Sequence, residues 1–277
     1  MPPMRACGPV HAWVRRGREN STQWPVRAWE QQKTAFHGRG ARAGPWGNPH
    51  FSWTWEIAVL RATSHKTWKV DAGEIPPCLL LEAASILTHG GLVIYPTETF
   101  YALGAVPALP EALARIYAVK GRQTGKPLPL IASRMEAALS AVSNWPESAD
   151  VLAAAFWPGP LTLLLPAASS LPLILHAGTG KVAIRISSHP VAVLLAQLAG
   201  GLLVSTSANR SGAPPPDNSE SLPPALLHGV EGLLDAGRLC GGLPSTIVDV
   251  TVAPPVLLRA GALDWNDISR ALDAARH

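Results

Sequence analysis

The chain has 277 residues, of which 47% are hydrophobic and 15% charged, so it is long and apolar enough to enclose a large core. Its net charge of +4 is uneven, because residues 1–75 hold 11 Lys and Arg against 5 Asp and Glu, whereas residues 76–277 hold 12 against 14. This distribution gives little support to nucleic-acid binding by residues 76–277, and no apolar run is long enough to span a membrane.

Residues 1–75 differ from the rest in composition and in hydrophobic pattern. They contain seven of the ten tryptophans among Gly, Pro and Arg, without a sustained period of 3.6 or 2. We therefore expect an N-terminal extension that is poorly ordered. An Arg-rich transit peptide and a basic aromatic arm that touches RNA are the alternatives.

From residue 76 onward, helical apolar stripes alternate with short apolar strands. A helix is predicted over 79–89, with glycines after it as a C-cap, and a buried strand over 92–95. A second helix is predicted over 110–119, with Pro and Glu in its first turn. The next elements are expected to be strands at 128–131, 161–165 and 182–186 and helices at 135–142 and 148–156.

The second half continues the same alternation. A helix is predicted over 190–198 and a strand over 202–205, with a loop at 214–218. The pattern predicts one α/β (or α+β) domain over 76–277, in which helices flank a single twisted mixed sheet. Later strands are expected at 232–235, 246–250 and 256–258.

Two cations, Lys120 and Arg122, stand on either side of a glycine at the end of the second predicted helix. Arg offers phosphate oxygens a planar fork and Lys offers a point charge, so the pair suits a polyanion. Capping of the helix C-terminus by solvated cations is the structural alternative.

A donor-rich turn follows the strand at 202–205. Ser205, Ser207 and Asn209 supply hydroxyls and an amide at the carboxyl end of that strand, where open sheets commonly bind ligands. An ordinary Ser/Asn turn that satisfies its own backbone is the alternative.

Two further arginines accompany apolar strands. Arg185 lies within the apolar run at 182–186, where an unpaired charge is costly, and Arg259 follows the strand at 256–258. Each suits an anionic ligand, and a structural salt bridge is the alternative. The hydroxyls of Thr99 and Ser245 stand in proline-marked turns of the kind that present ligand contacts.

Residues 76–277 lack the motifs of several common sites. No HExxH, CxxC, GxxxxGK[ST] or GxSxG motif occurs, and the histidines are not spaced as metal ligands. The cysteines, Cys7, Cys78 and Cys240, are too widely separated for a disulfide framework or a zinc knuckle and favour a reducing compartment. We therefore expect no protein-bound metal. We expect a site in which charged side chains hold the ligand, without an acid–base pair.

Taken in order, seven segments closely resemble the YrdC/Sua5 family of threonylcarbamoyl-adenylate synthases, in its short, single-domain form. They cover nearly all of residues 76–263, and residues 1–75 fall outside the resemblance. The segments are YPTETFYALGA at 95–105, KGRQTGKPLPL at 120–130, WPGPLTLLL at 157–165, VAIRISSHP at 182–190, STSANRSG at 205–212, PSTIVD at 244–249 and LLRAGAL at 257–263.

The resemblance implies a twisted α/β sheet around a deep, positively lined cavity. It also implies a cytoplasmic nucleotidyltransferase that converts L-threonine, bicarbonate and ATP, with Mg²⁺, into threonylcarbamoyl-AMP and pyrophosphate. The product would feed the tRNA threonylcarbamoyl-transfer machinery, which modifies N6 of adenosine 37, and weak contact of this chain with tRNA is part of the same expectation.

The resemblance also assigns roles to residues. Lys120 and Arg122 would carry the catalysis, while Lys126, Ile131 and Lys181 depart from the residues that the family usually has. The implied ATP-binding residues are Lys120, Arg122, Ser205, Ser207, Asn209 and Arg259, and the implied threonine-binding residues are Thr99, Arg185 and Ser245.

Two other functions remain as alternatives at this point. One is an RNA-binding module without catalysis, although residues 76–277 do not interleave aromatic and basic residues as RNA readers do. The other keeps the carbamoyl-adenylate chemistry but delivers the carbamoyl group to another acceptor.

Overall fold

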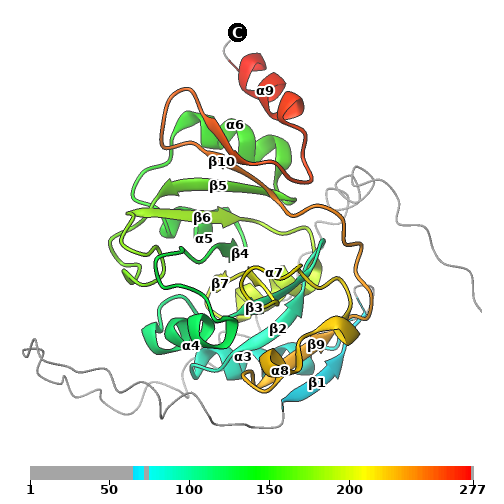
Figure 1. The fold of residues 1–277 in the computed structure, drawn as a ribbon. Helices are drawn as coiled ribbons and strands as arrows, with labels where there is room; N and C mark the ends of the chain where they lie inside the picture. Colours follow the sequence, from blue (N-terminus) through cyan, green and yellow to red (C-terminus); the bar gives the residue numbers. More distant parts are fainter. Residues whose placement is uncertain (1–64, 72–74, 276–277) are drawn as a thin grey trace, which may run out of the picture. The chain divides into compact units, whose positions relative to one another are not determined.

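The computed structural model describes residues 65–71 and 75–275, whose strands form two sheets (Figure 1). In strand order, the five-stranded sheet consists of β1 (Lys66–Lys69), β9 (Gly232–Asp235), β2 (Val93–Pro96), β3 (Tyr101–Gly104) and β8 (Thr206–Ser207). The six-stranded sheet consists of β11 (Val256–Arg259), β10 (Thr246–Asp249), β5 (Leu161–Pro166), β6 (Lys181–Arg185), β4 (Leu130–Ala132) and β7 (Leu202–Val204). The helices are α3 (Pro77–Thr88), α4 (Pro110–Lys120), α5 (Met135–Ser140), α6 (Glu147–Phe156), α7 (Pro190–Leu198), α8 (Pro224–Leu227) and α9 (Trp265–Ala274), with a 3-10 turn η1 (Ser219–Ser221).

Both sheets mix parallel and antiparallel pairs. In the smaller sheet, β9 is parallel to β1 and β2, whereas β3 is antiparallel to β2 and β8. In the larger sheet, β5 is parallel to β10 and antiparallel to β6, and β4 is parallel to β6. The mixed α/β class predicted from the sequence is confirmed.

The strands divide into two sheets, whereas the sequence predicted one. The unpredicted strand β3 folds back on β2 through the turn at 97–100 and pairs with β8. The strands β7 and β8 therefore belong to different sheets, although only Ser205 separates them in the chain. Apolar periodicity indicates a strand but not its partner, so this division was not predictable from the pattern.

The smaller sheet begins before the predicted domain boundary. Residues 1–64, most of the expected N-terminal extension, lie outside the described residues. Lys66–Lys69 forms β1, which pairs with β9, and Trp68 is 4% exposed. The boundary expected at residue 75 thus falls after the first strand of the sheet.

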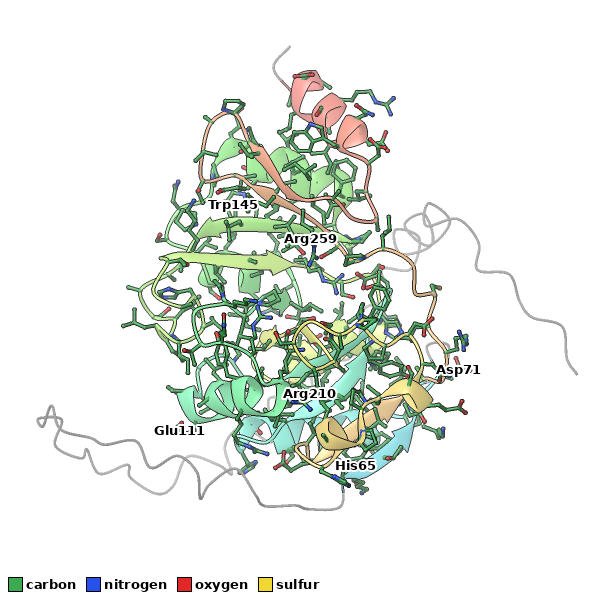
Figure 2. All side chains as sticks on the ribbon, viewed as in Figure 1. His65, Asp71, Glu111, Trp145, Arg210 and Arg259 are labelled. Carbon is green, nitrogen blue, oxygen red and sulfur yellow. The ribbon has the colours of Figure 1, made fainter. Side chains whose placement is uncertain are left out.

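Helices cover the sheets, and the buried apolar side chains form two clusters. Figure 2 draws the side chains on the ribbon. In the first, α3 and α7 pack against each other and bury Leu87 and Leu195. In the second, Leu113 of α4 joins Leu163 of β5 and Ile184 of β6. The helices α3, α4 and α7 each begin with a proline. Proline lacks an N–H, and at the first helical position this removes no hydrogen bond within the helix.

Three connecting segments converge between the two sheets. They are the hairpin turn 97–100, the single residue Ser205 between β7 and β8, and residues 236–245, which pass from β9 of the smaller sheet to β10 of the larger. The Gly241 N–H donates to the Thr99 carbonyl at 3.0 Å, which fastens the third segment to the first. These segments position the candidate site.

Candidate functional site

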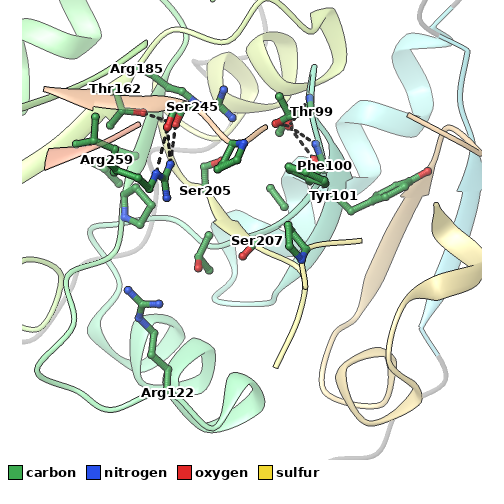
Figure 3. A pocket seen from close by; sticks show the side chains of 18 residues that line it. Thr99, Phe100, Tyr101, Arg122, Thr162, Arg185, Ser205, Ser207, Ser245 and Arg259 are labelled. Carbon is green, nitrogen blue, oxygen red and sulfur yellow. Dashed lines mark hydrogen bonds between the residues drawn. The ribbon is translucent and has the colours of Figure 1, made fainter. Parts of the chain in front are cut away.

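A cavity of about 330 Å³ lies where these segments meet (Figure 3). Its volume falls within the range of roughly 300–1,000 Å³ that is usual for small-molecule sites. Three arginines line it, from the end of α4, from β6 and from β11, together with hydroxyl side chains and prolines. Arg122 lies on one side of the cavity, and Arg185 and Arg259 lie on the other (Figure 3).

Arg122 reaches the cavity because α4 ends at a glycine. Gly121 adopts a left-handed conformation with φ 58°, which L side chains rarely adopt, and the chain leaves the helix there. The Arg122 guanidinium donates to the carbonyls of Lys126 at 3.3 Å and Pro127 at 2.9 Å. Burial lowers the pKa of Arg122.

Lys120 is buried behind the cavity wall. Its ammonium donates to the backbone carbonyls of Ser207 and Asn209, the latter at 2.8 Å, and to the Asn209 side-chain oxygen at 3.2 Å. The Ser207 hydroxyl donates to that same side-chain oxygen. Burial, reinforced by the charge of Arg122, lowers the pKa of Lys120 to about 7. Lys120 therefore ties the end of α4 to the loop that carries Ser207.

Ser205 and Ser207 present their side chains to the cavity from the junction of the two sheets. The Ser205 N–H donates to the Pro129 carbonyl at 2.8 Å. Beneath this junction, the buried Tyr95 hydroxyl donates to the Val204 carbonyl at 3.0 Å, and burial raises the pKa of Tyr95. Ser205 is thus held by the backbone of Pro129, while Ser207 pairs with Ala102 of β3.

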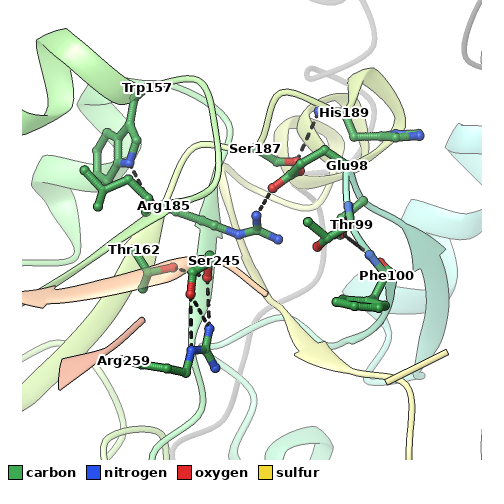
Figure 4. A network of polar contacts seen from close by, with 12 residues as sticks. Glu98, Thr99, Phe100, Trp157, Thr162, Arg185, Ser187, His189, Ser245 and Arg259 are labelled. Atoms are coloured by element: carbon green, nitrogen blue, oxygen red, sulfur yellow. Dashed lines mark hydrogen bonds and ion pairs between the residues drawn. The ribbon is translucent and has the colours of Figure 1, made fainter. Parts of the chain in front are cut away.

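Arg185 lies at the end of β6 with its side chain 10% exposed. Its Nη1 forms an ion pair with Glu98, whose other carboxylate oxygen accepts from the Ser187 hydroxyl (Figure 4). Burial lowers the pKa of Arg185 to about 10; Tyr95 opposes this shift and the charge of Arg259 adds to it. The salt bridge considered as an alternative from the sequence is present, and Arg185 lines the cavity as well.

Ser245 is the centre of a second hydrogen-bond group at the same end of the cavity (Figure 4). Its hydroxyl lies 2.8 Å from the Thr162 hydroxyl, and Arg259 donates to its carbonyl at 2.7 Å and to its hydroxyl at 3.1 Å. Gly261 packs directly against this segment, since a Cβ there would stand 2.2 Å from the Pro244 carbonyl oxygen. A side chain at 261 would therefore displace Ser245.

Seven of the nine predicted site residues line this one cavity, and the other two, Lys120 and Asn209, are bonded to Ser207 behind it. Their roles in binding and catalysis stay predictions. The sequence analysis missed Glu98 and Thr162 as members of the site. Each was visible as a polar residue in one of the quoted segments, Glu98 between two threonines and Thr162 within an apolar strand.

The chemistry of the cavity is that of an anion site. Among the described residues, no cluster of three or more His, Cys, Asp or Glu side chains could hold a metal ion. None of the helices in residues 65–71 and 75–275 combines the length and apolarity needed to cross a bilayer. The cavity wall supplies guanidinium groups and hydroxyls, which suit phosphate and carboxylate oxygens.

Comparisons with known proteins agree on one family. The family model Sua5_yciO_yrdC, described as "Telomere recombination", matches residues 85–261. The threonylcarbamoyl-AMP synthase of Pyrococcus abyssi (strain GE5 / Orsay) is 37% identical over 194 residues, which cover 70% of this chain and 57% of that protein. The threonylcarbamoyl-AMP synthase of Alkalilimnicola ehrlichii is 46% identical over 140 residues, covering 50% of this chain and 73% of that protein.

A solved structure shows the same fold. The crystal structure of P. abyssi Sua5 complexed with L-threonine has a TM-score of 0.71 and 34% identity, and the match covers 76% of this chain and 61% of that chain. The present chain thus spans somewhat more than half of the P. abyssi protein.

Proposed function

This chain belongs to the Sua5/YciO/YrdC family, and from that premise we propose that it is a threonylcarbamoyl-AMP synthase that uses L-threonine, bicarbonate and ATP and releases pyrophosphate. The observation that carries the proposal is the cavity, in which three arginines and several hydroxyls from separate segments meet. Relatives that bear this name, and one solved with L-threonine, support the choice of substrates.

The two sides of the cavity suit the two larger substrates. Arg185, with the Thr99 and Ser245 hydroxyls, would hold the carboxylate and polar groups of threonine. The nucleotide would lie toward Arg122, which offers its fork to phosphate oxygens. The remaining ATP-binding residues of the proposal are Ser205, Ser207, Asn209, Lys120 and Arg259. Lys120 and Asn209 hold Ser207 in place, and Arg259 would reach the nucleotide from the side of Arg185 (Figure 3).

The proposed reaction joins two anions. The threonine amine takes up CO2 from bicarbonate, water is lost, and a carbamate forms. A carbamate oxygen then attacks the α-phosphorus of ATP, the bond to the bridging β-phosphate oxygen breaks, and pyrophosphate leaves. The chain's contribution is to orient the two substrates and to offset their mutual repulsion with guanidinium groups.

Magnesium enters the proposal only as part of the substrate. ATP phosphates bind Mg²⁺ themselves, and the metal commonly keeps most of its other ligands as water. The described residues offer no cluster of three metal-ligating side chains, so we assign Mg²⁺ no protein site. The residues that face the complex would be Arg122 and the two serines of the β7–β8 junction.

The product determines the class of reaction that follows. Threonylcarbamoyl-AMP is a mixed anhydride, which donates its acyl group to an amine. We propose that the acceptor is N6 of adenosine 37 in tRNA, reached through a separate transfer machinery, with weak tRNA contact by this chain. A cytoplasmic location is part of the same proposal, in keeping with three widely separated cysteines.

The proposal is tested with the full chain, ATP, bicarbonate and a panel of amino acids, and pyrophosphate is measured for each amino acid. We expect release that depends on threonine and on bicarbonate together. Release without preference for threonine would favour another acceptor of the carbamoyl-adenylate chemistry. RNA binding without nucleotide turnover would favour a binding module.

A further inference from the structure

Glu98 is not among the residues that line the cavity, but it is paired with Arg185, which lines it. Glu98 lies in the hairpin turn at 97–100, where the Thr97 hydroxyl donates to the Phe100 carbonyl at 2.7 Å and accepts from the Phe100 N–H at 3.3 Å. Thr99, the next residue, lines the cavity. Glu98 itself reaches across from the smaller sheet to β6 of the larger one (Figure 4).

Both oxygens of Glu98 are already bonded inside the protein. One pairs with Arg185 Nη1 and the other accepts from the Ser187 hydroxyl, which in turn accepts the His189 N–H at 3.1 Å. Of the ion pairs in the described residues, this is the one in which both side chains are almost buried, at 10% for Arg185 and 14% for Glu98. Water therefore screens this pair less than it screens the others.

The other two cavity arginines have a different environment. The hydrogen bonds of Arg122 and Arg259 that the described residues supply go to backbone carbonyls and, for Arg259, to the Ser245 hydroxyl. Carbonyls and hydroxyls orient a guanidinium but leave its net charge in place. Glu98 instead opposes the charge of Arg185 as it is felt by a ligand in the cavity.

We propose that Glu98 acts as a specificity-determining residue: by offsetting the charge of Arg185 at an end of the cavity that also holds Arg259, it shifts the preference of this end toward a zwitterionic α-amino acid and away from a bare carboxylate. The inference rests on the proposed function for the identity of the amino acid. A bare carboxylate attracted by Arg185 is repelled by Glu98. A zwitterion carries no net charge. Its carboxylate is attracted by Arg185 and its ammonium by Glu98, so the presence of Glu98 changes its binding free energy little.

The test compares L-threonine with 3-hydroxybutanoate, which is threonine without its amino group. Binding of each to the full chain is measured by titration calorimetry for wild type and for Glu98→Gln. The glutamine keeps the size of the side chain, its carbonyl can accept from Arg185, and the Ser187 hydroxyl can turn to accept from its amide. We expect 3-hydroxybutanoate to bind on the order of tenfold more tightly to the variant, while the affinity for threonine changes by less than about threefold.

A matched control separates charge from loosened structure. Ser187→Ala removes the second hydrogen bond of Glu98 but leaves its charge, so 3-hydroxybutanoate should bind no more tightly than to wild type. The inference is overturned if Glu98→Gln weakens both ligands in parallel, leaves 3-hydroxybutanoate unchanged, or has no larger effect than Ser187→Ala. Failure of the proposed function would be a separate result. In that case pyrophosphate release would not depend on threonine, while Glu98→Gln would still bind 3-hydroxybutanoate more tightly than wild type does.

Discussion

The two arginines on opposite sides of the cavity are held in different ways. Arg185 is almost buried and paired with a carboxylate, whereas Arg122 extends from a helix end and is oriented by two backbone carbonyls. Burial lowers the pKa of both, and a guanidinium in a protein stays charged near neutral pH. Glu98 therefore offsets one of the two arginine charges on the side of Arg185 and Arg259, whereas Arg122 is in no ion pair among the described residues.

The largest expected effect on activity comes from a change to Arg122, which is not paired with an acidic side chain among the described residues. Arg122→Ala should lower kcat/KM for ATP roughly a hundred- to thousandfold, because it removes a charge that would face the phosphates in the transition state. Pyrophosphate release measures the loss, and circular dichroism checks that the fold is intact. Near-normal turnover would remove Arg122 from the mechanism.

The second variant tests Arg185, which is paired with Glu98. Arg185→Ala should raise KM for threonine more than KM for ATP, since the carboxylate loses its guanidinium. It should also lower the free energy of unfolding by about 3 kcal/mol, because Glu98 is left nearly buried without its partner. Adding Glu98→Gln should restore part of that stability but not the threonine affinity. A larger rise in the ATP requirement would contradict the division of the cavity.

The third prediction concerns Lys120, which like Arg122 is bonded to oxygens that carry no formal charge. Its pKa in the folded protein is about 7 against an ordinary value near 10.5, so between these values the unfolded chain holds a proton that the folded chain lacks. Stability should therefore rise with pH in this range. From pH 7 to pH 9, wild type should gain about 2 kcal/mol relative to Lys120→Met in urea unfolding. If the free energies of unfolding of wild type and Lys120→Met changed in parallel with pH, this would contradict the lowering of the Lys120 pKa by burial.

The smallest effect is expected at Ser245, which lies at the same end of the cavity as Arg185 (Figure 4). Ser245→Ala removes the hydroxyl contacts with Thr162 and Arg259, but Arg259 keeps its bond to the Ser245 carbonyl at 2.7 Å. We expect a loss of about 1 kcal/mol, seen as a roughly fivefold higher KM for threonine. Thr162→Val should reproduce part of this loss. A hundredfold effect would mean that Ser245 contacts the reacting atoms.

Local pattern predicted most helices and strands of residues 76–277, because their apolar periods and caps lie within a dozen residues. This pattern did not predict β3 and β8, which are short and acquire strand structure from their partners, or β1, which lies in a stretch without periodicity. It also predicted no helix at α8 or α9. Seven of the residues that line the cavity were predicted, from polar and charged residue types in strands, at a helix end and in turns. Glu98 was not, because its partner Arg185 is 87 residues away and an acid in a turn has no pattern of its own.

The connection at 236–245 limits how the chain can change in length. It is fastened at Thr99 through Gly241, and it must then deliver Ser245 in contact with both Arg259 and the backbone beside Gly261. One inserted or deleted residue would move Ser245 by about 3 Å while both sheets stayed intact. Surface loops elsewhere tolerate such insertions, so related chains that keep this cavity should share one spacing here.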